Sequence, residues 1–282
     1  MKVILSRKGF DSSYGGYPSP IFPNRKMISL PIPSDKDLIN YNNLKFGHNK
    51  NYYHLMKNLK SKILNKKWRD LNTNTKCHLD PDIYKGIYPH DLNWKPMFGQ
   101  MNAAAKHLDK QEVGDDDLFL FYGWFRPIKE INSKFQMTNG PDLHIIFGYL
   151  QIREKFHPTS NNILNWMKYH PHTAQFRINE KSNRIYIARE YLSWDSNIAG
   201  AGIFDFNENL VLTKKGLNRT QWDLPKFFRD VAISYHPKES KKYGWKDGFF
   251  QSATRGQEFV IQDNENVEKW AKDLINKNIK KS

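Results

Sequence analysis

Two long apolar runs dominate the pattern of hydrophobic and polar positions along the 282-residue chain. Residues 117–126 and 143–152 are almost continuously apolar or aromatic, a pattern typical of strands that are covered on both faces. Gly123 and Gly148 lie near the middles of the two runs, and a glycine inside a strand indicates a bulge or a sharp bend. We therefore predict that these two runs form the centre of a strongly coiled sheet.

Shorter apolar segments predict further strands at residues 3–5, 27–30, 184–190, 203–204, 210–213 and 258–261. Apolar residues spaced by three and four predict helices over 52–68 and 264–279, with short helical turns before residue 108 and over 222–228. Because loops rather than helices separate most strands, the pattern favours one α+β domain spanning residues 1–282. We expect a curved, mostly antiparallel sheet or a small barrel at its centre, with flanking helices.

Lysine and arginine outnumber aspartate and glutamate by 44 to 29, which gives a net charge of +15. This surplus favours a polyanionic partner, with nucleic acid ahead of a membrane surface; a solubility effect or codon bias is the alternative. The single cysteine, Cys77, excludes a disulfide framework and a cysteine-based zinc site, and it predicts a buried thiol in a reducing compartment. Without a signal peptide or an apolar run of about 18 residues, we expect a cytoplasmic protein that does not enter a membrane.

A glycine-rich polar loop follows the first predicted strand. Backbone N–H groups of such a loop bind anions, and glycine lets the chain approach a ligand closely. We interpret four of its side chains as phosphate-binding candidates and one as an acid–base candidate; they are Arg7, Lys8, Ser12 and Ser13, and Asp11. A surface turn is the alternative. The loop lacks the Gly-Lys-Ser/Thr ending of a P-loop and the glycine spacing of a dinucleotide-binding fingerprint.

A second polar loop enters the last predicted strand at residues 252–259. Arg255 offers a planar fork to phosphate or carboxylate, Gln257 can pair with the edge of a base, and Glu258 is a candidate general base. The alternative is that Arg255 and Glu258 pair with structural partners.

Aromatic and basic residues alternate near the two central runs. Trp124 and Tyr149 are candidates for stacking on an exposed base, and Arg126 is a candidate for contact with its phosphate. Core packing accounts for most of the other aromatic residues.

Two segments carry metal-like residue types. His78, Asp80 and Asp82 surround Pro81 in an extended segment, where both carboxylates can project to one side, and we place His78 and Asp82 as metal candidates and Asp80 as an acid–base candidate. An Asp-Pro turn is the alternative. The second segment holds His170 and His172, which together with His144 could bind a metal, although no zinc motif has this spacing.

The order of these blocks resembles the nucleotide modification associated domain 3 family of bacteria and phages. The blocks are SRKGFDSSYGGYPSPIFP, HLDPDI, FGQMNAAAKHL, DDDLFLFYGWFR, LHIIFGYLQI, HPH and ATRGQEFV, and they span nearly the whole chain. The family is named for its association with nucleic-acid modification systems, and the resemblance assigns no catalytic residue. Residues 114–122 and 146–152 also resemble the core of PUA-like barrels, which implies such a core at about residues 96–190.

From this we expect a protein that acts on or binds a DNA base in a base-modification pathway. Nucleic acid, DNA ahead of RNA, or a free nucleotide is the expected ligand. A non-catalytic reader of modified bases with an aromatic pocket is the alternative, and a toxin or defence factor that acts on nucleotides is a third possibility. The sequence assigns no cofactor and no protein partner, and it leaves open whether the protein is an enzyme.

Overall fold

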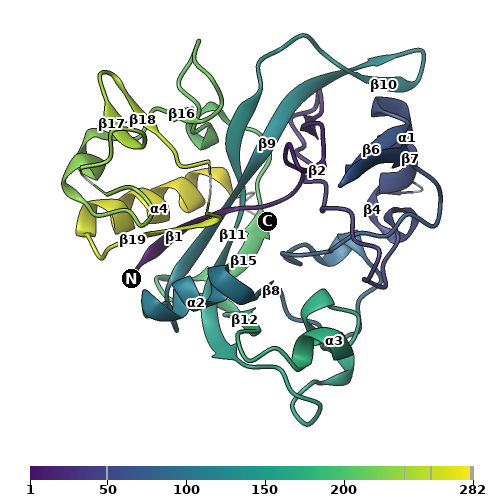
Figure 1. Cartoon of the computed structure of the whole chain (residues 1–282), viewed down its shortest axis with the longest axis horizontal. Coiled ribbons are helices and arrows are strands. Elements are labelled where there is room, and N and C mark those ends of the chain that lie inside the picture. Colours follow the sequence, from purple (N-terminus) through teal and green to yellow (C-terminus); the bar gives the residue numbers. More distant parts are fainter. Residues whose placement is uncertain (49, 238, 255, 280–282) are drawn as a thin grey trace.

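The computed structural model describes residues 1–48, 50–237, 239–254 and 256–279. Its described strands include a nine-stranded sheet whose main path runs β19-β1-β9-β11-β12-β8 (Figure 1). The bounds along this path are Glu258–Ile261, Val3–Arg7, Leu118–Ile131, Leu143–Phe156, Arg184–Ala188 and Met97–Gln100. Strand β10 (Lys134–Met137) and strand β3 (Ser19–Ile21) also pair with β9, and β15 (Ala201–Ile203) pairs with β11.

The sheet is mixed, with mostly antiparallel neighbours. β1 and β3 run parallel to β9, while β9–β11, β11–β12, β12–β8 and β1–β19 are antiparallel. The described strands form no closed barrel, so the α+β prediction is confirmed and its small-barrel variant is wrong. Strands β8, β9, β11 and β12, which come from the region with the PUA-like resemblance, form an open half of the sheet instead.

The two central strands were predicted from their apolar runs, and both are buried in the structure. All five residues from Leu118 to Tyr122 are at most 1% exposed, because helices and loops cover both faces of β9. The register between β9 and β11 shifts between Ile146 and Gly148, which confirms the bulge predicted at that glycine. Such a bulge increases the local twist of the sheet.

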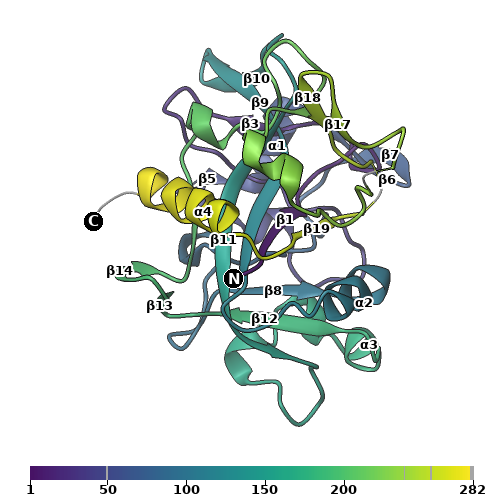
Figure 2. The same ribbon diagram turned by 90° about the vertical axis from the view of Figure 1, so that its left-hand side faces the viewer.

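Two helices border the outer strands of the sheet. Helix α4 (Glu265–Asn278) buries Val267, Ala271, Leu274 and Ile275 in the main core, which confirms the predicted C-terminal helix. The side chain of Asn264 caps its first turn by accepting backbone N–H groups of Asn266 and Val267. Helix α2 (Asn102–Lys110) lies near β19 and β8 (Figure 2).

The predicted helix over residues 52–68 is wrong in its second half. Helix α1 ends at Leu59, and the chain continues as a hairpin of β6 (Lys62–Asn65) and β7 (Lys67–Asp70). The C-cap residue Lys60 is already extended, with φ −163° and ψ 125°, and Lys66 has a positive φ of 62° at the hairpin turn. Ile63 has a helical spacing from Leu55 and Leu59 only by coincidence. It is a buried residue of strand β6.

The other elements are short. The remaining strands are β2 (Tyr14–Gly15), β4 (Lys45–Gly47), β5 (Lys50–Asn51), β13 (Tyr191–Leu192), β14 (Asp195–Ala199), β16 (Gln221–Trp222), β17 (Gly244–Lys246) and β18 (Phe249–Gln251), and helix α3 spans Gln175–Ile178. Short 3₁₀ turns occupy Tyr41–Asn43, Lys85–Ile87, Asn165–Met167, Pro171–Thr173, Glu208–Leu210 and Lys226–Asp230. Residues 27–30 and 210–213 make only isolated bridges rather than the predicted strands.

A second apolar cluster lies beside the main core. It is formed almost entirely by residues 10–87 and joins the sheet through Ile128 of β9. Cys77 belongs to it and is fully buried, and burial raises the pKa of its thiol well above the ordinary value. No described helix is long and apolar enough to cross a membrane.

Candidate functional site

A polar cavity opens where β1 ends. Its volume is about 150 Å³, and we call it the arginine pocket; its lining residues are Arg7, Phe10, Asp11, Ser12, Ser13, Trp124, His144, Arg219, Thr220 and Thr254. Because β1 and β9 are parallel neighbours, the loop after β1 lies beside Trp124, further along β9. The structure thus brings together Arg7, Asp11, Ser12, Ser13 and Trp124 of the sequence candidates.

Two guanidinium groups give the arginine pocket its charge. Arg7 donates to the backbone oxygens of Thr254 and Gly256 at 3.3–3.4 Å. Arg219 lies over the Trp124 ring at 4.0 Å from its centroid, in cation–π geometry. Burial lowers the pKa of Arg219, and the nearby Arg7 lowers it further, while Asp142 and Asp11 oppose the shift. An anion in the pocket would relieve this repulsion between the two cations.

The loop that carries Asp11 is held in a tight turn. The Asp11 carboxylate accepts the backbone N–H groups of Ser13 and Tyr14, both at 2.7 Å, as in an Asx-turn. Gly15 has a φ of +83°, and a Cβ atom there would lie 2.0 Å from the ring of Phe10. This glycine is therefore needed for the turn that presents Ser12 and Ser13 to the pocket.

His144 lines the arginine pocket as a neutral ring. Burial lowers its pKa well below the ordinary value, and Arg219 and Arg7 add to the shift. Its Nδ1 accepts the indole N–H of Trp222 at 3.1 Å, so the single proton of the neutral ring is on Nε2. The pocket therefore combines a carboxylate, an imidazole and two guanidinium groups.

Three other candidates have partners that limit their roles. Tyr149 is 2% exposed, stacks on Phe204 and donates its hydroxyl to the Ala199 carbonyl, so no face is open to a base. Arg126 forms an ion pair with Asp142 at 2.7 Å. The ring face of Trp124 is covered by Arg219, and its indole N–H is buried without a hydrogen-bond partner in the described residues.

Lys8 and Glu258 form a buried ion pair. The Lys8 ammonium donates to Oε1 of Glu258 at 2.6 Å and lies 4.4 Å from the centroid of Phe98. Gln100 donates to the same oxygen at 2.7 Å, whereas Oε2 of Glu258 has no partner among the described atoms. The sequence suggested phosphate binding for Lys8 and general-base chemistry for Glu258, but the structure pairs them with each other in the interior.

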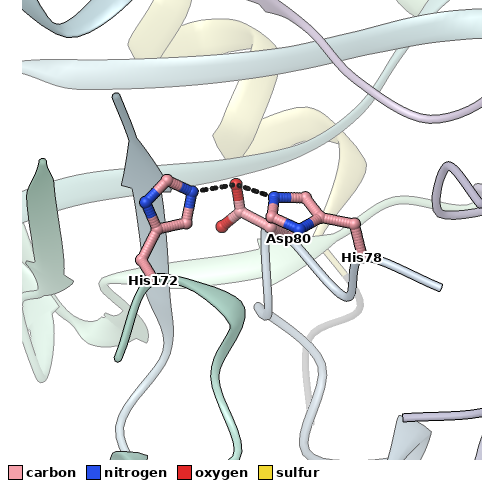
Figure 3. Close-up of side chains that lie close together, drawn as sticks. All are labelled: His78, Asp80 and His172. Carbon is pink, nitrogen blue, oxygen red and sulfur yellow. Dashed lines mark ion pairs between the residues drawn. The ribbon is translucent and has the colours of Figure 1, made fainter. Parts of the chain in front are cut away.

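A group of histidines surrounds Asp80 (Figure 3). We call His78, Asp80, His170 and His172 the His–Asp cluster. One Asp80 oxygen, Oδ2, lies 3.9 Å from Nε2 of both His78 and His172, and the other, Oδ1, lies 3.3 Å from Nε2 of His170. Oδ1 also accepts the backbone N–H of Gly99 at 2.8 Å.

The electrostatics of the His–Asp cluster favour an ionised Asp80 carboxylate and a neutral His172 ring. Burial acts to raise the pKa of Asp80, but His170, His172 and His78 outweigh it and lower the pKa to about 2. Burial lowers the pKa of His172 to about 3, against the opposing effect of Asp80. A carboxylate and imidazole nitrogens in this proximity are suited to holding a metal ion.

The remaining candidates lie elsewhere. The Asp82 carboxylate accepts hydrogen bonds from His90, Trp94 and Tyr169, which are not members of the His–Asp cluster. Gln257 is exposed, and its backbone oxygen accepts the N–H of Arg7 at 2.8 Å. Arg255 lies outside the described residues.

Strand β8 connects the His–Asp cluster to the buried ion pair. Gly99 contacts Asp80, and its neighbour Gln100 contacts Glu258. Sequence reasoning missed Arg219 and Thr220 in the arginine pocket and Asp37, Arg177 and Asn183 beside the His–Asp cluster. These residues belong to no local motif, and only the pairing of distant segments places them.

The fold and its pockets define a mixed α+β protein with a cation-rich site at the end of a parallel strand pair. The sequence pattern of nucleotide modification associated domain 3 matches residues 2–262. The chain therefore belongs to this family, which confirms the resemblance and associates the protein with nucleotide modification. Neither a search of curated proteins nor a search of solved structures finds a match.

Proposed function

We propose that the protein binds nucleic acid, preferentially DNA, and acts on a base within a modification pathway. A phosphate group occupies the arginine pocket, between Arg7 and Arg219, and the adjoining backbone follows the β6–β7 hairpin. The observation that carries this proposal is the continuity of the two surfaces. The loop that lines the pocket enters β2, and β2 pairs directly with β6 through Tyr14–Asn65 and Gly15–Leu64.

The β6–β7 hairpin has the composition of a nucleic-acid contact. Together with the end of α1 it carries five exposed lysines, which are Lys57, Lys60, Lys62, Lys66 and Lys67. Trp68 is 45% exposed, and the Lys60 ammonium lies 4.0 Å from the centroid of its ring. Cations that neutralise phosphates beside an exposed aromatic ring suit single-stranded or opened DNA.

Replacing Lys62, Lys66 and Lys67 by alanine is expected to weaken DNA binding and its dependence on salt. Each phosphate contact contributes about −0.7 to −0.9 to the slope of log K against log salt, so the triple variant should flatten this slope by about 2. Fluorescence anisotropy with single-stranded and duplex oligonucleotides between low and moderate salt measures both quantities.

The matched control is Lys269→Ala with Lys277→Ala. These exposed lysines lie on α4, at the opposite end of the molecule from the hairpin in Figure 1. This variant should keep the wild-type slope. A wild-type slope near zero, or equal losses in both variants, would contradict nucleic-acid binding by the hairpin.

The contents of the arginine pocket support an enzyme rather than an aromatic-cage reader. The pocket combines Asp11 and His144 with two arginines, whereas the ring of its Trp124 is covered by Arg219.

Asp11→Asn keeps an oxygen that can cap the turn but removes the negative charge. We expect this variant to bind DNA like the wild type and to lose the change in base composition that mass spectrometry detects in DNA incubated with protein and cell extract. Identical nucleoside profiles for both proteins would favour a reader.

A further inference from the structure

The protonation of His172 is determined by its neighbour Asn183. The amide nitrogen of Asn183 donates to the backbone oxygens of His172 and Arg177 at 2.9 and 3.0 Å. Its amide oxygen therefore faces Nδ1 of His172, at 2.7 Å, and can only accept. The ring proton must be on Nδ1, which leaves a lone pair on Nε2.

His78 is oriented in the same way by a carboxylate. Its Nδ1 lies 2.8 Å from Oδ2 of Asp37, and Asp37 is held in turn by the buried guanidinium of Arg177. An ionised Asp37 can only accept, so it holds a proton on Nδ1 of His78, and Nε2 is the ring nitrogen that faces the cluster. Such carboxylate–histidine pairs are the usual outer partners of metal-binding histidines, because they fix the tautomer and the ring orientation.

Three potential ligand atoms consequently face one another. Nε2 of His78, Nε2 of His172 and Oδ2 of Asp80 belong to a group whose ligand atoms all lie within 4.8 Å of one another, and both nitrogens lie 3.9 Å from the carboxylate oxygen (Figure 3). Lone pairs facing an anion in a buried site repel one another unless a cation lies between them. We propose that His78, Asp80 and His172 bind one divalent transition-metal ion of the zinc or ferrous type.

His170 supports this ligand set from the other side of the carboxylate. Its Nδ1 accepts the backbone N–H of His172 at 3.3 Å, so its Nε2 carries the proton and faces Oδ1 of Asp80. This Nε2 is fully buried and has no aligned hydrogen-bond partner in the described residues. His170 is thus a positioning residue that occupies Oδ1 and directs Oδ2 towards the two ligand nitrogens.

Distances and ligand types define the ion. Zinc bonds to nitrogen and oxygen of about 2.0–2.2 Å place tetrahedral ligand atoms about 3.4 Å apart. The two 3.9 Å separations therefore need to close by about half an ångström, and the separation of the two histidine nitrogens, which is at most 4.8 Å, by no more than about 1.4 Å. Imidazole ligands favour zinc, iron, copper or nickel over magnesium or calcium. Two histidines and one carboxylate leave coordination positions open to water or substrate, which is the arrangement of a catalytic rather than a structural site.

Gly99 shows how closely the fold packs His172. A Cβ atom at Gly99 would lie 2.2 Å from Cδ2 of His172, so β8 approaches the ring at a distance that only glycine allows. The same residue donates its N–H to Asp80. The backbone of β8 therefore positions two of the three ligands.

The test is direct metal binding by the full chain, which does not depend on the proposed nucleic-acid function. We expect protein stripped with EDTA to bind one equivalent of Zn²⁺ by calorimetry, to show the visible bands of nitrogen-ligated Co²⁺, and to bind no Mg²⁺ at the same concentrations. His78→Ala and Asp80→Asn should each weaken Zn²⁺ binding by at least about 100-fold, because the first removes one of only three protein ligands and the second removes the negative charge of another.

His54→Ala is the matched control, because His54 is an exposed histidine on α1, and it should bind like the wild type. Circular dichroism of each metal-free variant separates loss of the site from loss of the fold. His78→Ala is the more informative variant because it removes a ligand atom, and the His78 side chain is 17% exposed, against 5% for Asp80 and 3% for His172. Absence of stoichiometric Zn²⁺ or Co²⁺ binding, or equally tight binding by folded His78→Ala, would overturn the proposal.

Discussion

Replacement of Lys8 by methionine is expected to lower the free energy of unfolding by about 3–5 kcal/mol, because it removes one partner of a buried ion pair. Glu258 is fully buried, and its Oε1 receives the Lys8 ammonium at 2.6 Å. Without Lys8, only the neutral Gln100 amide remains to stabilise the carboxylate charge. Urea denaturation at pH 7 measures the change.

Two further variants test the cause. In Lys8→Met with Glu258→Gln the buried charge is gone, so most of the lost stability should return. Arg69→Met removes a comparable ion pair to Asp35 whose side chains are 36% and 64% exposed, and it should change stability by less than about 1 kcal/mol. A small effect of Lys8→Met, or a double variant less stable than the single one, would contradict the assigned role of this pair.

Stability is expected to fall as the pH drops from 6.5 to 4, partly through His236. Burial lowers the pKa of His236 to about 4, against about 6.5 in the unfolded chain. Between these values the unfolded state binds a proton that the folded state does not, so acidification favours unfolding. The contribution of His236 is fully present above pH 6.5 and is lost as the pH falls to about 4, with an upper limit of about 3 kcal/mol.

The surroundings of His236 explain this shift. Its ring packs against Phe250 and Phe259 at centroid distances of 4.8 and 4.7 Å. Its Nδ1 donates to the Ser234 carbonyl, and its Nε2 accepts the Ala253 N–H at 2.8 Å. Protonation of Nε2 would convert this acceptor into a donor that faces the N–H donor of Ala253. The buried ring therefore stays neutral.

His236→Gln preserves an acceptor for Ala253 but cannot titrate. The stability of this variant should decline less steeply than that of the wild type, so that the gap between them narrows from pH 7 to pH 5 in urea unfolding experiments. Buried His172 and His144 titrate with the same sign, and they contribute to the slope that remains. The exposed control His54→Gln should retain the wild-type slope; a parallel decline of His236→Gln and wild type would exclude the mechanism.

The local pattern of apolar and polar residues predicted the strands and helices that carry a continuous apolar run or a clear helical period. The apolar runs of β9 and β11, the strands β1 and β19, and helix α4 follow from period and composition alone. The hairpin β6–β7 was missed because Ile63 fits a helical and a strand pattern equally well. Its pairing with β2 through Tyr14–Asn65 and Gly15–Leu64, about fifty positions apart in the sequence, decided between them.

The candidate sites show the same division. Arg7, Asp11, Ser12 and Ser13 lie close together in the sequence, and a glycine-rich loop after a strand was sufficient to group them. The sequence could not place Arg219 beside Trp124, nor join His78 and Asp80 to His172 more than ninety positions away. The roles proposed for Lys8 and Glu258 changed for a related reason, since the β1–β19 register puts their segments side by side in the interior.

By itself, then, the sequence determined the residue types available, the central strands, the basic character and the family. The tertiary structure decided which of those residues meet. In the structure Asp82 binds residues outside the His–Asp cluster, Tyr149 lies in the core, and Lys8 and Glu258 form a buried ion pair. The physical reason is that a side chain's chemistry depends on its burial and partners, and these are set by strand pairing and register between distant segments rather than by local sequence.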